Sequence, residues 1–203
     1  MNHTHNETLD FGQFTATIQF WMEIDKLKQI ERKTKIYGQH RHENSAEHSW
    51  QLAIGLLTLK PFLPAHLDFF RMVKMALLHD IVEIDAGDVI AFDLAAREAN
   101  AENEKKAAHR IFGILSTPLK EEFMSLWEEY EDSLTPESKY AQVIDRIMPM
   151  MLNLHNGGQS WVDNGIAYEQ VIQRASIAKE MIPELYEVIV KQLQDAKNKG
   201  WLK

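Results

Sequence analysis

Apolar residues recur along most of this chain at helical spacing. In the segment 11–30 they fall at Phe14, Ile18, Trp21 and Met22, which predicts an amphipathic helix. The strict alternation of apolar and polar residues that is typical of half-buried strands is rare. The pattern therefore predicts an all-α fold.

Capping and breaking residues divide the remaining pattern into further helices. We expect them over 45–59, 67–79, 95–115 and 119–130, then from Pro136 through YAQVIDRIMPMMLNL, followed by two more helices divided near Pro183. Ser45 is the expected N-cap of the second helix, which Pro61 ends. Thr135 is the expected cap of the helix that begins at Pro136, with Ser138 at the capping-box position.

Two polar segments interrupt this pattern. RKTKIYGQHRHEN is a basic break that contains Gly38, and HNGGQSWVDNG contains two adjacent glycines and is expected to be a long loop. We find no repeat, low-complexity tract or Pro/Ser linker. The length of 203 residues and the apolar share of 45% suit one domain over 1–203.

The charge balance limits the partners that the surface can attract. Lys plus Arg number 22 and Asp plus Glu number 30, so the formal net charge is −8. An acidic surface argues against a nucleic-acid polymer or an anionic membrane as partner, although a local basic cluster can still bind one phosphate.

The chain contains no cysteine, which excludes disulfides and thiolate metal sites. Any metal must be held by His, Asp, Glu or backbone oxygen. The N-terminal stretch MNHTHNETLD lacks a signal-peptide pattern, and the apolar runs are too short to span a membrane. We therefore expect a cytoplasmic protein.

Three ionisable sites interrupt apolar helices. They are His48 in SAEHSWQLAIGLL, the pair His79 and Asp80 after VKMALL, and Asp145 in AQVIDRIMPMML. A buried carboxylate needs a partner, and two histidines with two carboxylates could bind a divalent ion: Co, Mn, Ni, Fe, Zn or Mg. Adjacent helical residues point about 100° apart, so His79 and Asp80 can share an ion if they lie at a helix end.

A simpler interpretation of these residues is also open at this point. Single histidines in helices are more often core or surface residues than metal ligands, and Asp145 could pair with Arg146. The acids Glu83, Asp85 and Asp88 could be ordinary turn residues. Spacing alone does not decide between the two interpretations, but Glu83 lies one helical turn after His79 and would face the same side.

Taken together, these residues resemble a known family. His48, His79–Asp80 and Asp145 are similar to the H…HD…D pattern of the HD-domain metal-dependent phosphohydrolases. ENSAEHSWQLA and LLHDIVEIDAGD resemble two motifs of its small members, and LKQIER resembles their upstream arginine segment. The resemblance covers about residues 10–160 and is strongest toward the HD-type 5'-deoxynucleotidases. It implies a helical HD-domain bundle.

The resemblance also implies roles for single residues. It implies that one divalent ion is bound by His48, His79, Asp80 and Asp145. Glu83 would activate or position the attacking water, Asp88 would be a second acid/base or orienting group, and Arg32 would hold the substrate phosphate. The chain departs from the deoxynucleotidases in having Lys33 where an aromatic residue follows the arginine, and in one extra residue between Arg32 and His48.

The expected function is a metal-dependent phosphomonoesterase acting on nucleoside or deoxynucleoside 5'-monophosphates. The alternatives are an HD phosphohydrolase of cyclic nucleotides or nucleoside triphosphates, and a non-catalytic metal- or nucleotide-binding module. The resemblance further implies a homodimer. No role is assigned to Asp85 or to the basic residues Lys33, Lys35 and Arg41.

Overall fold

The structure is a computed structural model that describes residues 9–203. Its regular elements in these residues are helices and one two-stranded antiparallel sheet, so the all-α prediction is confirmed with one small exception. Most of the polar N-terminal stretch lies outside the described residues. Within the described part, no helix is both long and apolar enough to cross a membrane.

The first helix, α1 (Thr15–Asp25), lies between two short 3₁₀ turns. The basic segment after it, which we expected to be an irregular break, forms the strands β1 (Glu31–Lys35) and β2 (His42–Asn44). That prediction was wrong because tertiary contacts hold this polar hairpin in place. The hydroxyl of Ser160 donates to the Lys33 carbonyl at 2.7 Å, and the Asn156 amide donates to the Lys35 carbonyl at 3.2 Å.

The second helix, α2 (Ser45–Leu59), begins one residue earlier than its expected cap implied. Asn44, and not Ser45, is the N-cap, and it forms a capping box with Glu47. Ser45 is instead the first helical residue, and its buried hydroxyl donates to Glu83 at 2.5 Å. The capping prediction was therefore wrong by one position, because the serine side chain is used in a long-range contact.

The third helix, α3 (Phe69–Leu78), ends where the ionisable residues begin. A 3₁₀ turn (His79–Val82) and the short helix α4 (Glu83–Ala86) continue the helical path, as the placement of Glu83 required. Gly87 then takes a positive φ of 77°, which only glycine adopts readily, and turns the chain toward Asp88.

The remaining helices agree with the sequence pattern in number and order up to α7. They are α5 (Leu94–Phe112), α6 (Thr117–Glu131) and α7 (Pro136–His155), and α7 begins with the expected capping box of Thr135 and Ser138. The expected loop at 155–165 contains a short helix, α8 (Gln159–Asn164). That loop prediction was wrong because the Asn153 side chain accepts from the backbone of Ser160 and of Trp161, which is buried.

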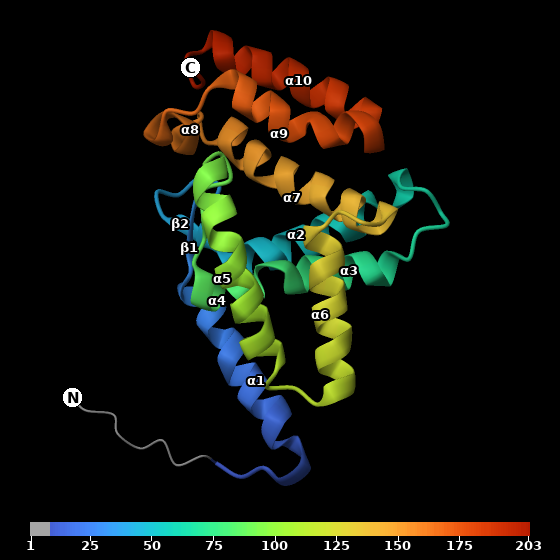
Figure 1. Ribbon diagram of the computed structural model, residues 1–203. Coiled ribbons are helices and arrows are strands. Elements are labelled where there is room, and N and C mark those ends of the chain that lie inside the picture. Colours follow the sequence, from blue (N-terminus) through green and yellow to red (C-terminus); the bar gives the residue numbers. More distant parts are fainter. Residues whose placement is uncertain (1–8) are drawn as a thin grey trace, which may run out of the picture.

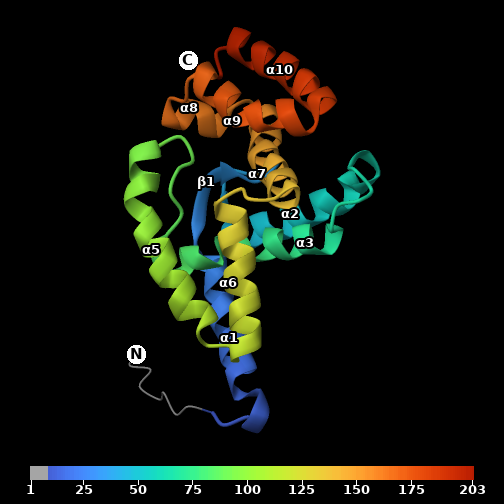
Figure 2. The ribbon, with the colours of Figure 1, turned by 45° about the vertical axis from the view of Figure 1, so that its right-hand side comes forward.

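The central helix of the fold is α7, which contacts α2, α3 and α9. Helices α9 (Tyr168–Met181) and α10 (Pro183–Asn198) pack as an antiparallel pair above it, at the end of the molecule opposite the start of α1 (Figures 1 and 2). Helices α2 and α7 pack closely at Gly55, where a Cβ atom would lie 3.1 Å from Cγ2 of Ile144 and 2.6 Å from the flexible Cε end of Met148. This close packing places polar residues of α2 beside those of α7.

Candidate metal and phosphate site

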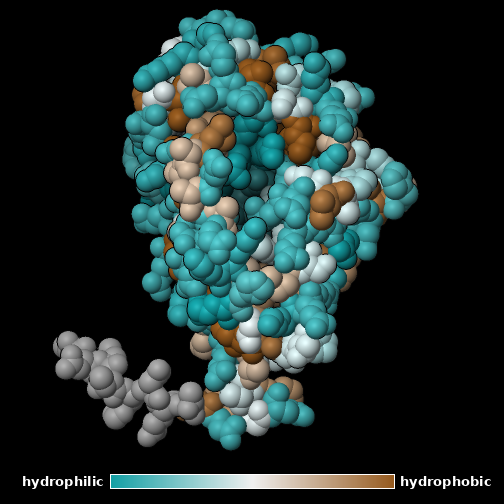
Figure 3. Space-filling model, viewed as in Figure 1, coloured by the Kyte–Doolittle hydropathy of each residue, from teal (hydrophilic) through white to brown (hydrophobic). Residues whose placement is uncertain are grey.

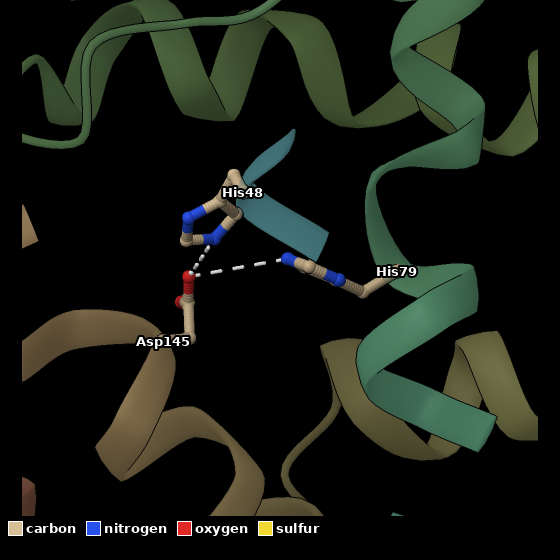
Figure 4. A group of neighbouring side chains, drawn as sticks. All are labelled: His48, His79 and Asp145. Carbon is tan, nitrogen blue, oxygen red and sulfur yellow. Dashed lines mark hydrogen bonds and ion pairs between the residues drawn. The ribbon is translucent and has the colours of Figure 1, made fainter. Parts of the chain in front are cut away.

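Three of the expected ligands come together from three different elements. His48 in the first turn of α2, His79 at the end of α3 and Asp145 in the middle of α7 offer ligand atoms that all lie within 4.8 Å of one another (Figure 4). The Nε2 atom of His48 is 2.9 Å from Oδ1 of Asp145, and the Nε2 atom of His79 is 3.9 Å from the same oxygen.

The imidazole of His79 is held in one orientation. Its Nδ1 atom donates to the backbone carbonyl of Ala76 at 3.0 Å, which leaves the Nε2 atom facing the carboxylates. That buried Nε2 atom has no well-aligned hydrogen bond among the described residues, although Oδ1 of Asp80 lies 3.0 Å away. A histidine whose Nδ1 is fixed by a carbonyl and whose Nε2 is open has the arrangement found in metal sites.

Glu43 on β2 lies behind His48 and is almost completely buried. Its Oε1 atom faces Nδ1 of His48 at 3.9 Å and Nε of Arg32 at 3.3 Å. Burial raises the pKa of Glu43 to about 7, although Arg32 partly offsets the effect. The sequence pattern missed this residue, because a glutamate in a polar segment carries no signal of burial.

The two histidines have different proton affinities. Burial and the positive charge of Arg32 lower the pKa of His48. Burial alone would also lower the pKa of His79, but Asp80 and Asp145 outweigh it and raise that pKa to about 9. The carboxylates of Asp80 and Asp145 therefore stabilise a positive charge on His79. A metal cation bound in place of the His79 proton would be stabilised by the same two carboxylates.

Asp80 and Asp145 are buried, but contacts with cationic groups keep the pKa of each carboxyl low. Burial would raise the pKa of each, but His79 and Arg32 lower the pKa of Asp80 to about 2, and His48 lowers the pKa of Asp145 well below its usual value. The outer oxygen of Asp80 accepts from Arg32 at 2.9 Å, and that of Asp145 lies 3.7 Å from Arg174. Both carboxylates are thus ionised and oriented.

These residues fit a divalent metal ion. The imidazoles of His48 and His79 and the carboxylate of Asp145 form a donor set that Zn, Co, Mn, Fe and Ni accept. Asp80 is not part of this three-residue group, but its Oδ1 atom lies 3.0 Å from the open Nε2 atom of His79. The expectation that His79 and Asp80 lie at a helix end is met, since α3 ends at Leu78.

Glu83 and Asp88 lie at the same site and line the same cavity. Burial and the charges of Asp80 and Asp88 raise the pKa of Glu83 well above its ordinary value. Burial likewise raises the pKa of Asp88, against the opposing effect of Arg32. Both carboxyl groups therefore hold a proton more readily than exposed acids do, as acid/base groups require.

Arg32 on β1 is surrounded by carboxylates. Besides Asp80 it contacts Glu43 at 3.3 Å and Asp88 at 3.8 Å, and its guanidinium is mostly buried. Despite burial, these acids raise its pKa further above the ordinary value, so it is permanently charged. Arg32 thus links the hairpin to the metal-binding residues.

A cavity of about 200 Å³ opens beside these residues. It corresponds to the hydrophilic hollow between α5 and α7, below the C-terminal helices, in Figure 3. Three further arginines also line it: Arg97 and Arg174, which the sequence pattern did not single out, and Arg146. Arg146 donates to Gln142 at 2.9 Å and forms no ion pair with Asp145 in residues 9–203, so the alternative partner for Asp145 is not found.

The residues without an assigned role mostly lie elsewhere. Asp85 pairs with Arg110, Arg41 with Glu47, and Lys35 with Asp163, and none of these side chains lines the cavity. Lys33, at the position of the deoxynucleotidase aromatic residue, does line it.

Comparisons with known proteins identify the family to which this fold belongs. The solved structure described as a "predicted metal-dependent phosphohydrolase" from Magnetospirillum magnetotacticum MS-1 is 35% identical, with a TM-score of 0.88 over 94% of this chain and 95% of that one. The 5'-deoxynucleotidase HDDC2 of Danio rerio is 29% identical over 139 residues, or 68% of each chain. Its counterpart from Xenopus laevis is 31% identical over 132 residues, or 64% of each.

The chain therefore spans about two thirds of the length of these curated relatives. A family model described as "HD domain" matches residues 24–186, a range that includes both histidines and both aspartates of the site. Since this match covers most of the sequence, the chain belongs to the HD domain family.

Proposed function

We propose that this protein is a divalent-metal-dependent phosphomonoesterase that releases phosphate from nucleoside or deoxynucleoside 5'-monophosphates. The observation that carries the proposal is the convergence of His48, His79 and Asp145 beside a polar cavity. The names of the relatives support the nucleotide substrate, since they are described as 5'-deoxynucleotidases.

His48, His79, Asp80 and Asp145 are the proposed metal ligands. When bound, a divalent ion at these residues lowers the pKa of a water molecule and withdraws charge from a phosphoryl group. The Ala76 carbonyl orients the imidazole of His79, and Glu43 lies 3.9 Å behind Nδ1 of His48, too far for a hydrogen bond but close enough to interact with its charge.

Glu83 is the proposed acceptor of the proton from the attacking water. Its raised pKa favours proton uptake, and the Ser45 hydroxyl holds one carboxylate oxygen at 2.5 Å. Asp88 is proposed as the second carboxyl group that holds or returns a proton. Arg32 is proposed to hold the substrate phosphate, for which guanidinium groups offer two parallel hydrogen bonds.

A metal-dependence screen tests this function. The protein is stripped with chelator, then supplied separately with Co, Mn, Ni, Fe, Zn or Mg and assayed for phosphate release. We expect release from nucleoside 5'-monophosphates with at least one metal and none after chelation. Faster hydrolysis of cyclic nucleotides or triphosphates would favour the alternative enzyme, and metal binding without hydrolysis of any substrate would favour the non-catalytic module.

The same screen addresses sugar preference. Lys33 lines the cavity where the deoxynucleotidases have an aromatic residue, so we do not expect strong rejection of the ribose 2'-hydroxyl. Ribose and deoxyribose monophosphates would be compared directly. The homodimer and the cytoplasmic location remain predictions, for which light scattering and cell fractionation are the tests.

A further inference from the structure

Asp80 and Asp145 make the same pattern of contacts. Each directs one oxygen at a histidine: Oδ1 of Asp80 lies 3.0 Å from Nε2 of His79, and Oδ1 of Asp145 lies 2.9 Å from Nε2 of His48. Each directs its other oxygen at a guanidinium, with Arg32 at 2.9 Å from Asp80 and Arg174 at 3.7 Å from Asp145. Two arginines from opposite ends of the chain therefore flank the proposed metal ligands.

Arg32 and Arg174 differ in how many carboxylates their N–H donors already contact. Arg32 contacts three carboxylates, those of Asp80, Glu43 and Asp88. Within residues 9–203, Arg174 has one carboxylate in ion-pair range, at 3.7 Å, and no hydrogen bond to any side chain or carbonyl. A guanidinium carries five N–H donors, so Arg174 keeps most of them available to a ligand.

The surroundings of Arg174 favour an anion. Its side chain is 18% exposed and lines the cavity, and Arg146 on α7 and Arg97 on α5 line the same cavity. Glu104 and Glu131 also line it, but neither forms an ion pair with these arginines in the described part of the chain. The other acids that line the cavity, Asp80, Glu83, Asp88 and Asp145, belong to the proposed site. A divalent ion bound there would offset part of their charge, which leaves the arginines available to an anion.

We propose that Arg174, which lies beside Asp145 as Arg32 lies beside Asp80, binds the phosphoryl oxygens of the substrate. The inference rests on the proposed function, because it assigns the phosphate ester of that same site. A monoester dianion has three terminal oxygens, enough for guanidinium groups on both sides. Arg146 and Arg97 add positive potential at the cavity but are not assigned a direct contact.

The experiment measures the binding of inorganic phosphate to the Co²⁺-loaded protein by calorimetry. Arg174→Gln should weaken phosphate binding at least about tenfold, since it removes a charged hydrogen-bond donor. Arg174→Lys should bind phosphate more tightly than Arg174→Gln but more weakly than wild type, because lysine keeps the positive charge but lacks the paired N–H donors of the guanidinium. Lys179→Gln is the matched control: it removes one exposed positive charge from the same helix, outside the cavity, and should bind as wild type does.

A purely structural role for Arg174 predicts a different result. If the arginine only orients Asp145, Arg174→Gln should lower the affinity for Co²⁺ and alter its visible absorption spectrum, which reports the ligand geometry. Our inference predicts that both stay close to wild type while phosphate affinity falls. Unchanged phosphate affinity in Arg174→Gln, or failure of the wild-type protein to bind phosphate, would overturn it.

A second measurement does not depend on a variant that folds. In the wild-type protein, phosphate should protect Arg174 from modification by phenylglyoxal, as located by peptide mass spectrometry; modification that phosphate does not slow contradicts the inference. The two proposals fail separately. Phosphate binding through Arg174 without ester hydrolysis would refute the proposed function alone, and hydrolysis that Arg174→Gln leaves unchanged would refute the inference alone.

Discussion

Asp145 on α7 holds its Oδ1 atom 2.9 Å from the Nε2 atom of His48 on α2, although 97 residues separate them in sequence. Both helices are otherwise lined with apolar side chains at this level, including the buried residues Leu52, Ala141 and Ile144. Two polar groups buried together in such a core need each other or a shared ligand. His48 and Asp145 satisfy each other, but the neighbouring Nε2 atom of His79 has no aligned partner among the described residues, and the three groups together favour a shared metal ion.

Replacing Asp145 by Ala should remove metal binding and activity together. Removing a residue that only supports a metal ligand typically lowers metal affinity by about 10- to 100-fold. Removing a ligand itself should therefore lower metal affinity by more than about 100-fold. Metal content after dialysis and phosphate release are the measurements. Asp195→Ala, which removes an exposed aspartate on α10, is the control. If the Asp145 variant kept its metal and its activity, the ligand assignment would be wrong.

Glu83→Gln should separate metal binding from turnover. The amide keeps the shape of the side chain but cannot accept the proton, so we expect a rate loss of about 10²- to 10⁴-fold with metal content unchanged. Ser45→Ala removes the hydroxyl that holds Glu83 and should cost less, because the carboxylate itself remains. A fully active Glu83→Gln enzyme would show that another group takes the proton.

The helices could be predicted because they depend on local pattern, whereas the grouping of the ionisable residues followed from the family resemblance, since spacing alone left it open. Apolar spacing sets the helices, and a polar residue such as Asp145 in an apolar face requires an explanation wherever the helix packs. The helix end at His79 also followed from geometry, since adjacent residues cannot otherwise face one point.

The missed features depend on contacts between distant segments. The β1–β2 hairpin has no alternating pattern and is held by Ser160 and Asn156, more than a hundred residues later. Glu43 and Arg174 look like ordinary surface residues until the hairpin and α9 place them behind His48 and beside Asp145. No local signal in the sequence marks either position.

Glu43→Gln should weaken metal binding without removing a metal ligand. The Oε1 atom of Glu43 lies 3.9 Å from Nδ1 of His48, on the side of the ring away from Asp145. Residues that support a metal ligand in this way typically contribute about 10- to 100-fold to metal affinity. Competition with a chromophoric chelator measures the change. Asp88→Asn is the comparison, because Asp88 also lies near Arg32 but does not contact His48. Equal metal affinities for the two variants would indicate that Glu43 acts through Arg32 instead.

Glu129 should make the stability of the fold depend on pH. It is buried on α6, where it accepts from Arg71 of α3 at 2.7 Å and from Thr135, the cap of α7, at 2.5 Å. Burial alone would raise its pKa, but these hydrogen bonds outweigh burial and lower the pKa below 4.5. A lowered folded-state pKa means that the stabilisation is complete above pH 4.5 and is lost as the pH falls through the folded value.

Glu129→Gln should therefore lower the free energy of unfolding by about 1–3 kcal/mol at pH 7, since it removes a charged hydrogen-bond acceptor. The difference from wild type should shrink as the pH falls below the folded pKa, where the wild-type carboxylate becomes protonated. Urea denaturation across this range measures it. Glu122→Gln, which breaks an exposed pair with Lys74 between the same two helices, should change stability by less than about 1 kcal/mol. A Glu129→Gln deficit that persists unchanged at low pH would mean that lost packing, and not lost charge, is its cause.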